Sequence, residues 1–453
     1  MTAVTTETVV VRAMTRYQPM LRAGAEQLGM SGTGPVGFHL PADDDRLARF
    51  HEVSDIAVQR AGTWRGHHVS LLDLMRNPGT RTTKTFASLH IVARAVQHIR
   101  DTGEPLLLTT PTSGNKGTAL RDAVARAYAA GLATPDELRV LTVAPAHSHP
   151  KLRDSPLSAD PGLRAANPLI VADVSRPDDV KALTRSAYER LRSEPTRFTP
   201  WFTLDLENYR IADTLRAYAE AELDPIGPRS RPRVHAHAVS SAFGLLGYHL
   251  GVSLLERHAD WGLPAPHRHP GFLLVQQLAT PDMVLSLLKG GTARDLLPRY
   301  RRPEPAGPWR QEGDPHFPAV TDALDERLDA TFYTSAPPTS AEINSLVARY
   351  GGTGVVVSRR ECLDHYEDIA ALLAPLGHRL PEDPADIREW SLVKAVTGAM
   401  LAASRRLVAS GTDLLVHASG FYTDDTLPPL RAGAQLEVSS SVAIEDAMLR
   451  AAR

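Results

Sequence analysis

Three turns, each between a predicted strand and a predicted helix or at a strand end, carry residue types that could bind an anion. The first has the sequence PTSGNKG at 111–117 and follows the apolar run 105–110. Such a turn presents several backbone N–H groups at the positive end of a helix, which stabilises a phosphate or a carboxylate. It is not a Walker A loop, because Lys116 is followed by glycine rather than by Ser or Thr. From this turn alone, an anion site and an ordinary capped turn remain equally open.

The second turn has the sequence VSSAFG at 239–244. Its small residues allow the backbone to approach a ligand closely, and the hydroxyls of Ser240 and Ser241 add hydrogen-bonding groups. A serine that simply caps a helix would give the same sequence without a ligand. The third turn, HASG at 417–420, ends the apolar run 413–419 and by itself indicates only the end of a strand.

Lys84 is a candidate nucleophile. It lies in TRTTKTF at 80–86, just before apolar residues recur at helical spacing from Phe86 to Val96. A lysine at the buried start of a helix can lose its proton through desolvation and then act as an amine nucleophile. The alternative is a solvated surface lysine, which is the commoner state of this residue type.

Two pairs of histidines could hold a metal ion, but their surroundings favour loops. His147 and His149 lie in HSHP, and His267 and His269 lie in HRHP. A His-x-His pair suits a metal when it lies on a strand and further ligands support it. Because both pairs adjoin prolines, we expect solvated loops and predict no metal site.

Three other side chains have structural interpretations. His235 and His237 alternate along one predicted strand that runs into the second turn, and we expect them to pack in the core. Cys362 has no histidine beside it in the sequence, so we interpret it as a structural thiol.

The elements that must position these residues alternate between strands and helices. Helical patterns occupy 118–132, 177–192 and 245–259, between short apolar runs that we interpret as strands. The predicted strands are 105–110, 138–144, 168–174, 234–240, 271–277, 354–358 and 413–419. Strands that alternate with helices need crossover connections, so the predicted fold class is α/β with parallel sheets.

The predicted division into domains is discontinuous. Residues 85–205 contain a compact series of strands and helices and are expected to form a small, mobile, substrate-binding domain. Residues 1–84 and 206–453 would together form the large domain, and α/β proteins commonly hold ligands between two such sheets. The proline-rich segment 294–320 has weak periodicity and is expected to be an irregular surface loop.

The composition limits the classes of function. The chain has 453 residues, which suggests two to three domains, and its 50 Lys and Arg against 52 Asp and Glu give a net charge of −2. This balance argues against a general nucleic-acid-binding protein, which usually has a basic excess. The sequence has no run of about 18 apolar residues, so we expect no membrane span.

Cysteine content and the N-terminal sequence bear on the compartment. Cys362 is the only cysteine, which excludes an intrachain disulfide and a multi-cysteine metal site. Residues 1–16 lack a basic segment followed by an apolar one, so no signal peptide is predicted. We therefore expect a cytoplasmic protein, and its richness in Ala, Arg and Pro suggests a GC-rich bacterial gene.

The order of these segments resembles the fold-type II pyridoxal-phosphate (PLP) enzymes, and within them the threonine synthase branch. TSGNKG resembles the S-G-N-x-G loop of that family, and it follows the TxxK-T-F segment. SSAFGLLGYHLG followed by GLP resembles the pattern T-G-N-F-G-N…A-G-Y…G-L-P. Asn208-Tyr209-Arg210 resembles N-P-Y-R, ASGFYTDD resembles T-G-H-G-L-K-D, and 378–407 resemble the C-terminal helices of the branch. The resemblance covers roughly residues 70–425.

This resemblance implies a two-domain fold with PLP bound between the domains, mainly by the large one. Lys84 matches the lysine that forms the Schiff base with PLP, and Asn115 matches the residue that contacts the ring oxygen. Ser419 matches a neutral partner of the pyridine nitrogen. The residues that match the cofactor-phosphate loop are Ser240, Ser241, Ala242, Phe243 and Gly244.

The resemblance also implies a substrate loop. Thr112, Ser113 and Gly114 match the loop that closes on the substrate carboxylate, together with Asn115 and Lys116. Lys116 replaces a small or neutral residue of the family, and we expect it to be solvated rather than in contact with substrate.

Two further departures concern the cofactor side of the site. The phosphate loop has Ser241-Ala242 in place of the family's Gly-Asn pair, and Thr85 stands where an aspartate is common. Together with Lys116, these changes suggest a substrate other than the phosphohomoserine of threonine synthase.

The reaction type follows from Ser419, if the resemblance holds. PLP joined to an amino acid acidifies the α-hydrogen, and Lys84 would be the base that removes it. A hydroxyl cannot stabilise a charged pyridinium as a carboxylate would, which favours rapid loss of a leaving group. We therefore expect a PLP-dependent lyase or transferase that eliminates or replaces a group at the β or γ carbon of an amino acid.

Two other functions remain open. The chain could be a catalytically degenerate scaffold that acts as a partner subunit, which the altered SSAFG turn would favour. It could also be another α/β enzyme that binds a phosphorylated ligand at its glycine-containing turns. The expected partners are a small amino-acid substrate and a second copy in a homodimer, with neither nucleic acid nor membrane.

Overall fold

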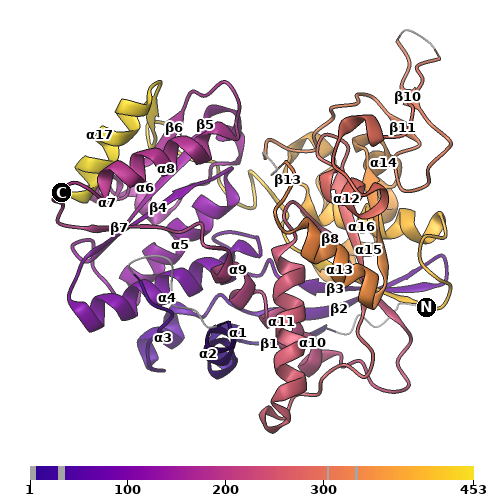
Figure 1. Cartoon of the computed structure of the whole chain (residues 1–453), viewed down its shortest axis with the longest axis horizontal. Coiled ribbons are helices and arrows are strands. Elements are labelled where there is room, and N and C mark those ends of the chain that lie inside the picture. The colour runs from indigo at the N-terminus through magenta and orange to yellow at the C-terminus, as the bar shows by residue number, and fades with distance from the viewer. Residues whose placement is uncertain (1–6, 29–35, 304–305, 332–334) are drawn as a thin grey trace.

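Two sheets, each flanked by helices, form two halves of the molecule that lie side by side (Figure 1). The structure is a computed structural model that describes residues 7–28, 36–303, 306–331 and 335–453. The alternation of strands with helices and the mostly parallel pairing confirm the predicted α/β class.

The first half contains a five-stranded parallel sheet. Its strands, in spatial order, are β16 (Leu436–Val438), β6 (Leu169–Ala172), β5 (Leu138–Pro145), β4 (Leu106–Pro111) and β7 (Thr199–Phe202). Helices α4 (Lys84–Thr102) and α5 (Asn115–Ala129) cover one face, and α8 (Asp179–Leu191) with α17 (Ser441–Ala452) covers the other. Because both faces are covered, every residue of β4 and β6 is buried, and most of them are apolar.

The second half contains a seven-stranded sheet. Its order is β1 (Glu7–Val10), β2 (Ile56–Trp64), β3 (His67–Asp73), β14 (Asp413–Ala418), β8 (Arg233–Ala238), β9 (Gly271–Gln277) and β12 (Gly352–Val357). The first three strands are antiparallel, and the pairing from β3 to β12 is parallel. Helix α16 (Ser391–Ser404) packs on one face, while α10 (Leu215–Leu223) and α11 (Phe243–Arg257) pack on the other.

Shorter elements complete the two halves. The remaining helices are α1 (Ala13–Arg16), α2 (Gln18–Gln27), α3 (Asp45–Phe50), α6 (Pro156–Ala159), α7 (Pro161–Ala166), α9 (Leu206–Ala212), α12 (Asp282–Lys289), α13 (Ser340–Tyr350), α14 (Arg359–Asp364) and α15 (Tyr366–Leu373). The remaining strands are β10 (Trp309–Arg310), β11 (Val320–Thr321), β13 (Ile387–Glu389) and β15 (Tyr422–Thr423). The predicted loop 294–320 is thus mostly irregular, with one short hairpin at β10 and β11.

All seven strands predicted from the sequence are present, as β4, β5, β6, β8, β9, β12 and β14. The sequence interpretation did not include the antiparallel strands β1 to β3 or the short strand β7. The C-terminal segment also differs from the expected division, because β16 pairs with β6 of the first half and α17 packs on α8. Residues 436–452 therefore lie with the first sheet rather than with the rest of 206–453.

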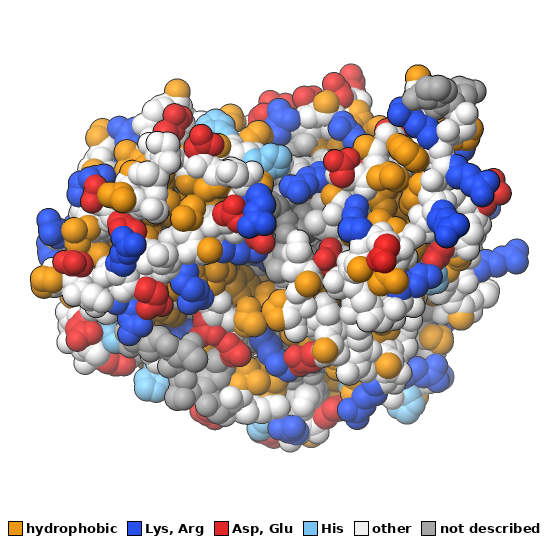
Figure 2. Space-filling view, turned by 45° about the horizontal axis from the view of Figure 1, so that its top comes forward, with side chains coloured by type: hydrophobic (Ala, Val, Ile, Leu, Met, Phe, Trp, Pro, Cys, Tyr) orange, Lys and Arg blue, Asp and Glu red, His pale blue; other side chains and the backbone are white. Residues whose placement is uncertain are grey.

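The surface carries charges of both signs. In the view of Figure 2, blue and red side chains are interspersed, and neither sign forms a broad patch on that face. Among the described helices, none is both long and apolar enough to cross a membrane.

Candidate active site

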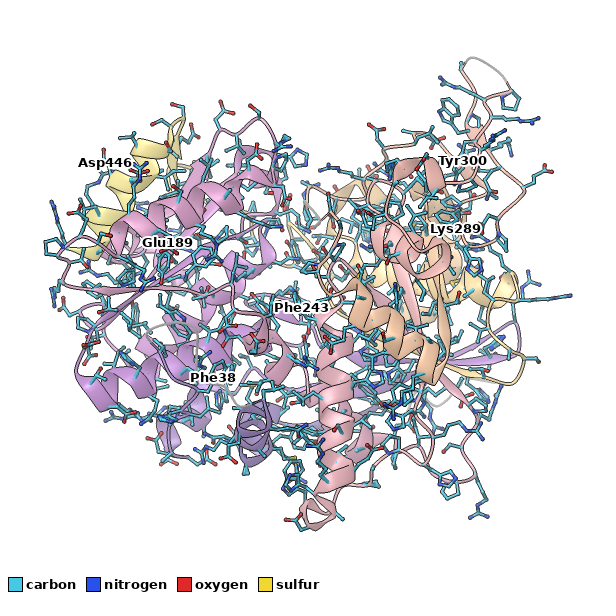
Figure 3. The ribbon with its side chains drawn as sticks, viewed as in Figure 1. Phe38, Glu189, Phe243, Lys289, Tyr300 and Asp446 are labelled. Atoms are coloured by element: carbon cyan, nitrogen blue, oxygen red, sulfur yellow. The ribbon has the colours of Figure 1, made fainter. Side chains whose placement is uncertain are left out.

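A cavity of about 270 Å³ lies where the two halves meet, at the carboxyl ends of β4, β8 and β14. This edge is where open α/β sheets commonly hold ligands. Phe243, labelled near the centre of Figure 3, lies at this junction. The cavity is lined by eleven of the twelve predicted site residues: Lys84, Thr112, Ser113, Asn115, Lys116, Ser240, Ser241, Ala242, Phe243, Gly244 and Ser419.

Lys84 is the first residue of α4, and its half-buried side chain reaches into the cavity. Its ammonium nitrogen lies 5.4 Å from the centre of the Tyr209 ring. Burial lowers the pKa of Lys84 below its ordinary value, and Arg216 adds to that shift while Asp213 and Glu389 oppose it. A lysine with a lowered pKa has more of the neutral amine, the form that attacks a carbonyl carbon.

Ser419 is held beside Lys84 by the backbone. It follows the last residue of β14, and its carbonyl accepts a hydrogen bond of 2.9 Å from the N–H of Thr83. A second contact between the same two segments is the antiparallel bridge between Thr82 and Gly420. The strand end and the start of α4 therefore form one rigid wall of the cavity.

The turn 112–117 is fixed by its own threonine. Oγ1 of Thr112 accepts hydrogen bonds from the backbone N–H of Gly114 at 3.0 Å and of Gly117 at 2.8 Å. Gly114 has φ +120, and a Cβ there would lie 2.7 Å from Cβ of Lys151. Glycine is therefore required at 114 both for its backbone conformation and for the close approach of Lys151. Gly114 is the one predicted site residue outside the cavity lining, and it acts by shaping the turn.

The side chain of Asn115 is oriented by two partners. Tyr422 donates its hydroxyl hydrogen to Oδ1 of Asn115 at 2.7 Å, and Nδ2 of Asn115 donates to the carboxylate of Glu389. Both partners come from the second half, so Asn115 lies in a contact between the halves. The carboxylate fixes which end of the amide carries the donor hydrogens.

Glu389 is a cavity residue that the sequence interpretation missed. Its side chain is 2% exposed, and its carboxylate accepts a hydrogen bond from Nζ of Lys151 at 2.5 Å and from Ser391 Oγ at 2.5 Å. Burial raises the pKa of Glu389, but the charge of Lys151 and hydrogen bonds from Lys151, Ser391 and Asn115 outweigh it and lower the pKa to about 2. Glu389 is therefore ionised at neutral pH. The only signal in the sequence was its place in the segment 378–407.

Lys151 joins the two halves through two carboxylates. It is 1% exposed, and besides Glu389 it forms an ion pair of 3.2 Å with Asp329, also buried. Its amine also donates to Oγ1 of Thr331 at 2.5 Å. Burial alone would lower the pKa of Lys151, but the two carboxylates raise it, so this lysine is charged.

The turn before α11, Ser240 to Gly244, lines the cavity. Ala242 precedes the helix with a left-handed φ of 49, and no side chain caps the helix. Because the first N–H groups of a helix have no acceptor within it, this turn can bind an anion. Thr339 anchors the turn by donating its hydroxyl hydrogen to the carbonyl of Ser241 at 2.7 Å.

Arg216 is a second cavity residue that the sequence interpretation missed. It extends from α10 to residues 240–244, which we call the anion turn. A Cβ on Gly244 would lie 2.7 Å from the guanidinium carbon of Arg216. Arg216 donates to Asp213 Oδ1 at 2.7 Å and to Thr83 Oγ1 at 3.0 Å. A side chain at 244 would displace the guanidinium from its present position.

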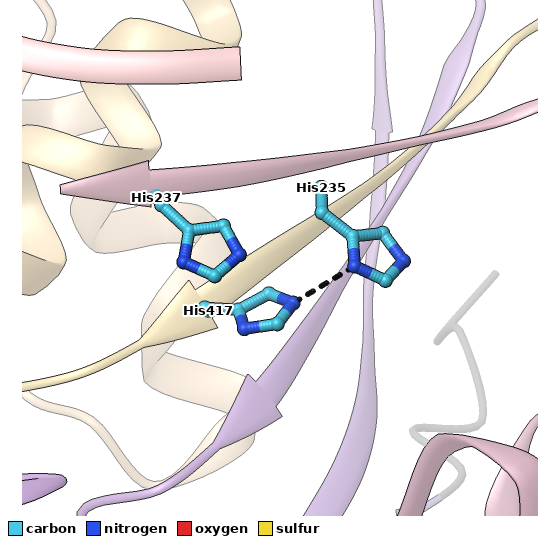
Figure 4. A group of neighbouring side chains, drawn as sticks. All are labelled: His235, His237 and His417. Carbon is cyan, nitrogen blue, oxygen red and sulfur yellow. Dashed lines mark hydrogen bonds between the residues drawn. The ribbon is translucent and has the colours of Figure 1, made fainter. Parts of the chain in front are cut away.

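A chain of buried hydrogen bonds leads away from Arg216. Because a guanidinium can only donate, Nδ1 of His417 accepts its N–H at 3.1 Å. Nε2 of His417 then donates to Nδ1 of His235 at 3.1 Å, the bond drawn in Figure 4. Nε2 of His235 in turn donates to Glu220 at 3.1 Å. Burial keeps the pKa of His417 well below its ordinary value, which is consistent with this neutral form.

His237 completes a cluster of three histidines with His235 and His417. The ligand nitrogens lie within 4.8 Å of one another, a spacing that a metal ion could bridge. However, the guanidinium of Arg216 fixes the proton on Nε2 of His417, and its positive charge opposes a cation. We therefore interpret the cluster as buried core in which His235 and His417 are hydrogen-bonded. His235 and His237 are buried as expected, but His237 also lines the cavity.

Three other expectations have clear outcomes. His147 and His149 are exposed, as expected, and Cys362 is buried with a pKa raised by burial to about 12, as a structural thiol should be. His267 is exposed too, but His269 is not simply solvated, because its ring stacks on Tyr350 at 4.2 Å between centres.

The expectation that Lys116 is solvated is wrong. Its half-buried side chain lines the cavity, and its amine donates to the carbonyl of Thr203 at 3.2 Å. It also lies 5.7 Å from the centre of the Tyr209 ring, on which Lys84 also packs. Lys116 turns inward because α5 begins at the junction of the halves, where Thr203 and Tyr209 are its neighbours.

The fold is similar to that of solved PLP enzymes. A PLP-bound threonine synthase from Brucella melitensis matches with a TM-score of 0.52 and 13% identity, over 90% of this chain and 84% of that one. Yeast threonine synthase matches with a TM-score of 0.52 and 11% identity, over 88% and 80%. A pyridoxal 5'-phosphate-dependent aspartate racemase matches with a TM-score of 0.50 and 12% identity, over 91% and 97%. These similarities confirm the expected fold-type II architecture.

The sequence comparisons identify the family of this chain. A search of curated proteins gives no match to this chain. Residues 9–452 match the family DUF6002, described as a family of unknown function. Because this match covers nearly the whole chain, the protein belongs to the DUF6002 family.

Proposed function

We propose that this protein is a PLP-dependent enzyme that eliminates or replaces a group at the β or γ carbon of an amino acid. The observation that carries the proposal is the position of Lys84. Its amine, with a lowered pKa, reaches into the cavity that the anion turn and Asn115 also line. A reactive amine and an anion site in one cavity are what a phosphorylated aldehyde needs.

The residues present fit the phosphate of PLP. The turn 240–244 offers backbone N–H groups at the start of a helix of 15 residues, and Arg216 adds a buried positive charge beside it. The missing Gly-Asn pair does not remove this function, because Ala242 itself adopts the left-handed conformation.

The residues also fit the ring of the cofactor. Asn115 lines the cavity and is held by Tyr422 and Glu389, so it can keep one donor hydrogen directed at an oxygen of the ring. Ser419 offers a hydroxyl beside Lys84. Covalent attachment would then use the amine of Lys84.

When bound, PLP withdraws electrons from an attached amino acid and makes its α-hydrogen acidic. Nζ of Lys84 is placed to accept and return a proton in the cavity, because its lowered pKa favours the neutral amine. The turn around Thr112 is held rigid, and we propose that it orients the substrate carboxylate through Ser113 and the adjacent backbone. The contacts of Lys151 and Asn115 across the halves keep this wall closed and limit the access of water.

Ser419 supports elimination or replacement over other reactions. If PLP binds with its pyridine nitrogen toward Ser419, the hydroxyl would not hold a proton there as a carboxylate would, and the ring would delocalise charge less readily. Loss of a good leaving group from the β or γ carbon would then be faster than reactions that need a long-lived carbanion. Similar folds belong to threonine synthases and to an aspartate racemase, so the fold itself does not choose between these reactions.

The test of cofactor binding is a covalent label. Purified protein is incubated with PLP, its absorption spectrum is recorded, and borohydride reduction followed by peptide mapping locates the cofactor. We expect a visible band and a label on Lys84 that the variant Lys84→Ala loses and the variant Lys289→Gln keeps. A label on Lys394 or Lys151 would show that the reactive lysine lies elsewhere.

The alternatives predict different outcomes. A protein that takes up no PLP would favour a phosphorylated ligand of another kind, and one that binds PLP on Lys84 but transforms no amino acid would favour a degenerate scaffold. The reaction type is tested with amino acids that carry a β or γ leaving group. Release of the leaving group reports either reaction, and ammonia with a 2-oxo acid reports elimination. Exchange of the α-hydrogen with deuterium from solvent, without loss of the leaving group, would indicate a racemase instead.

A further inference from the structure

Lys116 is a cavity lysine that has no carboxylate beside it to balance its charge. Its amine donates one hydrogen bond, to the carbonyl of Thr203 at 3.2 Å, and it faces the ring of Tyr209. Within the described part of the chain, no carboxylate comes within 4.0 Å of this amine. When it is charged, Lys116 therefore has two further N–H groups with which it can bind a ligand.

Three other charged side chains of the cavity have ion-pair partners within the protein, whereas Lys84, the proposed reactive amine, has none among the described residues. Arg216 pairs with Asp213 at 2.7 Å. Lys181, at the rim, pairs with Asp178 at 2.7 Å. Glu389 forms an ion pair of 2.5 Å with the buried Lys151, which does not line the cavity. The pairing leaves no local anion for Lys116.

The nearest charge of the same sign makes the position of Lys116 costly. Lys84 and Lys116 both approach the Tyr209 ring, within 5.4 and 5.7 Å of its centre. Burial, with a smaller contribution from Lys84, holds the pKa of Lys116 well below its ordinary value. A bound anion would reverse both effects, since it would restore a charged and paired ammonium.

The expected sites for the other anions of a reaction complex lie elsewhere. The turn 240–244 and Arg216 belong to the second half and suit a phosphate. The turn 112–114 offers Ser113 and backbone groups for an α-carboxylate, and it leads into α5, where Lys116 is the second residue. Lys116 is therefore free to bind a third negative charge. The side chain of the substrate is the part of the complex that can carry this charge.

We propose that Lys116 binds an anionic group on the side chain of the substrate, so that the site selects amino acids with a second negative charge, a carboxylate or a phosphate. The inference rests on the proposed function, because it assumes that the amino acid binds beside Lys84. Lys116 is then the residue that determines specificity, and Tyr209 is the surface on which its stem rests.

The test compares amino acids of matched size with PLP-loaded protein. Binding of L-aspartate is compared with that of L-asparagine, and binding of O-phospho-L-serine with that of L-serine, by calorimetry and by the change in cofactor absorption. We expect the native protein to bind the anionic member of at least one pair tenfold or more tightly. Which pair shows the preference distinguishes a carboxylate from a phosphate.

Three variants separate recognition from folding. Lys116→Gln should abolish the preference and leave the affinity for the neutral member nearly unchanged, whereas Lys116→Arg should keep part of the preference. Lys289→Gln, which removes a lysine far from the cavity on the exposed end of α12, should bind as the native protein does. PLP affinity is measured for each variant, so that a change in cofactor binding is not mistaken for a change in specificity.

Other outcomes overturn the inference. If Lys116→Gln weakens neutral and anionic amino acids equally, this lysine binds the α-carboxylate. If it weakens PLP binding strongly, Lys116 contacts the cofactor. If the native protein binds PLP on Lys84 but shows no preference in either pair, the inference fails while the proposed function stands. If PLP does not bind to Lys84 at all, the proposed function fails and the inference fails with it.

Discussion

Two lysines of the first half, Lys151 and Lys116, reach the junction of the halves in opposite electrostatic surroundings. Lys151 is held between two buried carboxylates at 2.5 and 3.2 Å. Lys116 meets a carbonyl and an aromatic ring, with a second lysine as its nearest charge. Burial lowers the pKa of both, but only for Lys151 do neighbouring charges reverse the shift.

The difference separates structural from functional charge. In a buried ion pair, each charge is already balanced by its partner and is not available to a ligand. Such a pair holds together the segments that carry it. A cation without a counter-charge destabilises the empty protein and gains most when an anion binds. Similar side chains a few ångströms from one cavity can thus have opposite effects on stability.

The largest effect is expected from Lys151→Met. It leaves Asp329 and Glu389 buried without a counter-charge, and breaking such a pair costs about 3–5 kcal/mol of the free energy of unfolding. Urea unfolding followed by circular dichroism measures the loss. Lys289→Met, which breaks a partly exposed pair with Asp314, should cost less than about 1 kcal/mol. An equal loss in both variants would show that the buried ion pairs contribute no more to the free energy of unfolding than the exposed pair.

A smaller effect, with a definite pH dependence, is expected from Glu389→Gln. The folded protein lowers the pKa of Glu389 from 4.5 to about 2, so the ionised carboxylate stabilises the fold fully above pH 4.5. That contribution, of about 3 kcal/mol at 1.36 kcal/mol per pKa unit, is lost as the pH falls from about 4.5 toward 2. The variant should therefore lose stability at neutral pH and show a shallower decline on acidification.

Urea unfolding at a series of pH values between 6 and 3 measures that slope. Glu445→Gln is the control, because it removes a carboxylate from an ion pair on the surface, with Arg190. It should keep the native slope. If Glu389→Gln also keeps the native slope, Glu389 is not the carboxylate that couples folding to protons.

Tyr422→Phe removes one neutral hydrogen bond from Asn115. We expect a loss of about 0.5–1.5 kcal/mol in the free energy of unfolding, and a changed PLP absorption band because Asn115 is no longer held from both ends. Tyr366→Phe removes a comparable hydrogen bond, to the carbonyl of Pro381 at 2.8 Å, away from the cavity. Tyr366→Phe should lower the free energy of unfolding by a similar amount and leave the absorption band unchanged. The same spectral change in both variants would show that it does not arise from the contact between Tyr422 and Asn115.

The smallest effect, with the opposite sign, is expected from Lys116→Met. Methionine keeps most of the apolar stem beside Tyr209 and removes an uncompensated buried amine, so stability should be unchanged or rise by up to about 1 kcal/mol. Urea unfolding of the protein without ligand checks this. A loss comparable to that of Lys151→Met would mean that Lys116 has a structural role and would erase the distinction between the two lysines.

The parts of the fold that the sequence predicted are those with local signals. β4, β5 and β6 are short apolar runs between turn residues, and the start of α4 follows from the helical spacing after Lys84. The turns at 112–117 and 240–244 were found for the same reason, because glycine and small residues mark them directly. These signals also located most of the cavity wall.

What the sequence interpretation missed depends on pairing across the molecule. Glu389 acts through Lys151, 238 positions earlier. Lys116 was identified, but its inward position depends on a hydrogen bond to Thr203, 87 positions later. No spacing rule within one segment could bring these pairs together. Arg216 looked like an ordinary residue of α10, and only the absence of a side chain at Gly244 reveals why it can reach the turn.

The return of the chain end to the first sheet affects how the protein can fold during synthesis. β16 pairs with Ile170 and its neighbours in β6, and α17 covers apolar residues of α8. Until the ribosome has released residues 436–452, the edge of β6 and that face of α8 stay uncovered, although every other strand of the sheet has already emerged. The first half therefore begins to fold early and finishes last, and in that interval an exposed edge strand invites aggregation and a need for chaperones.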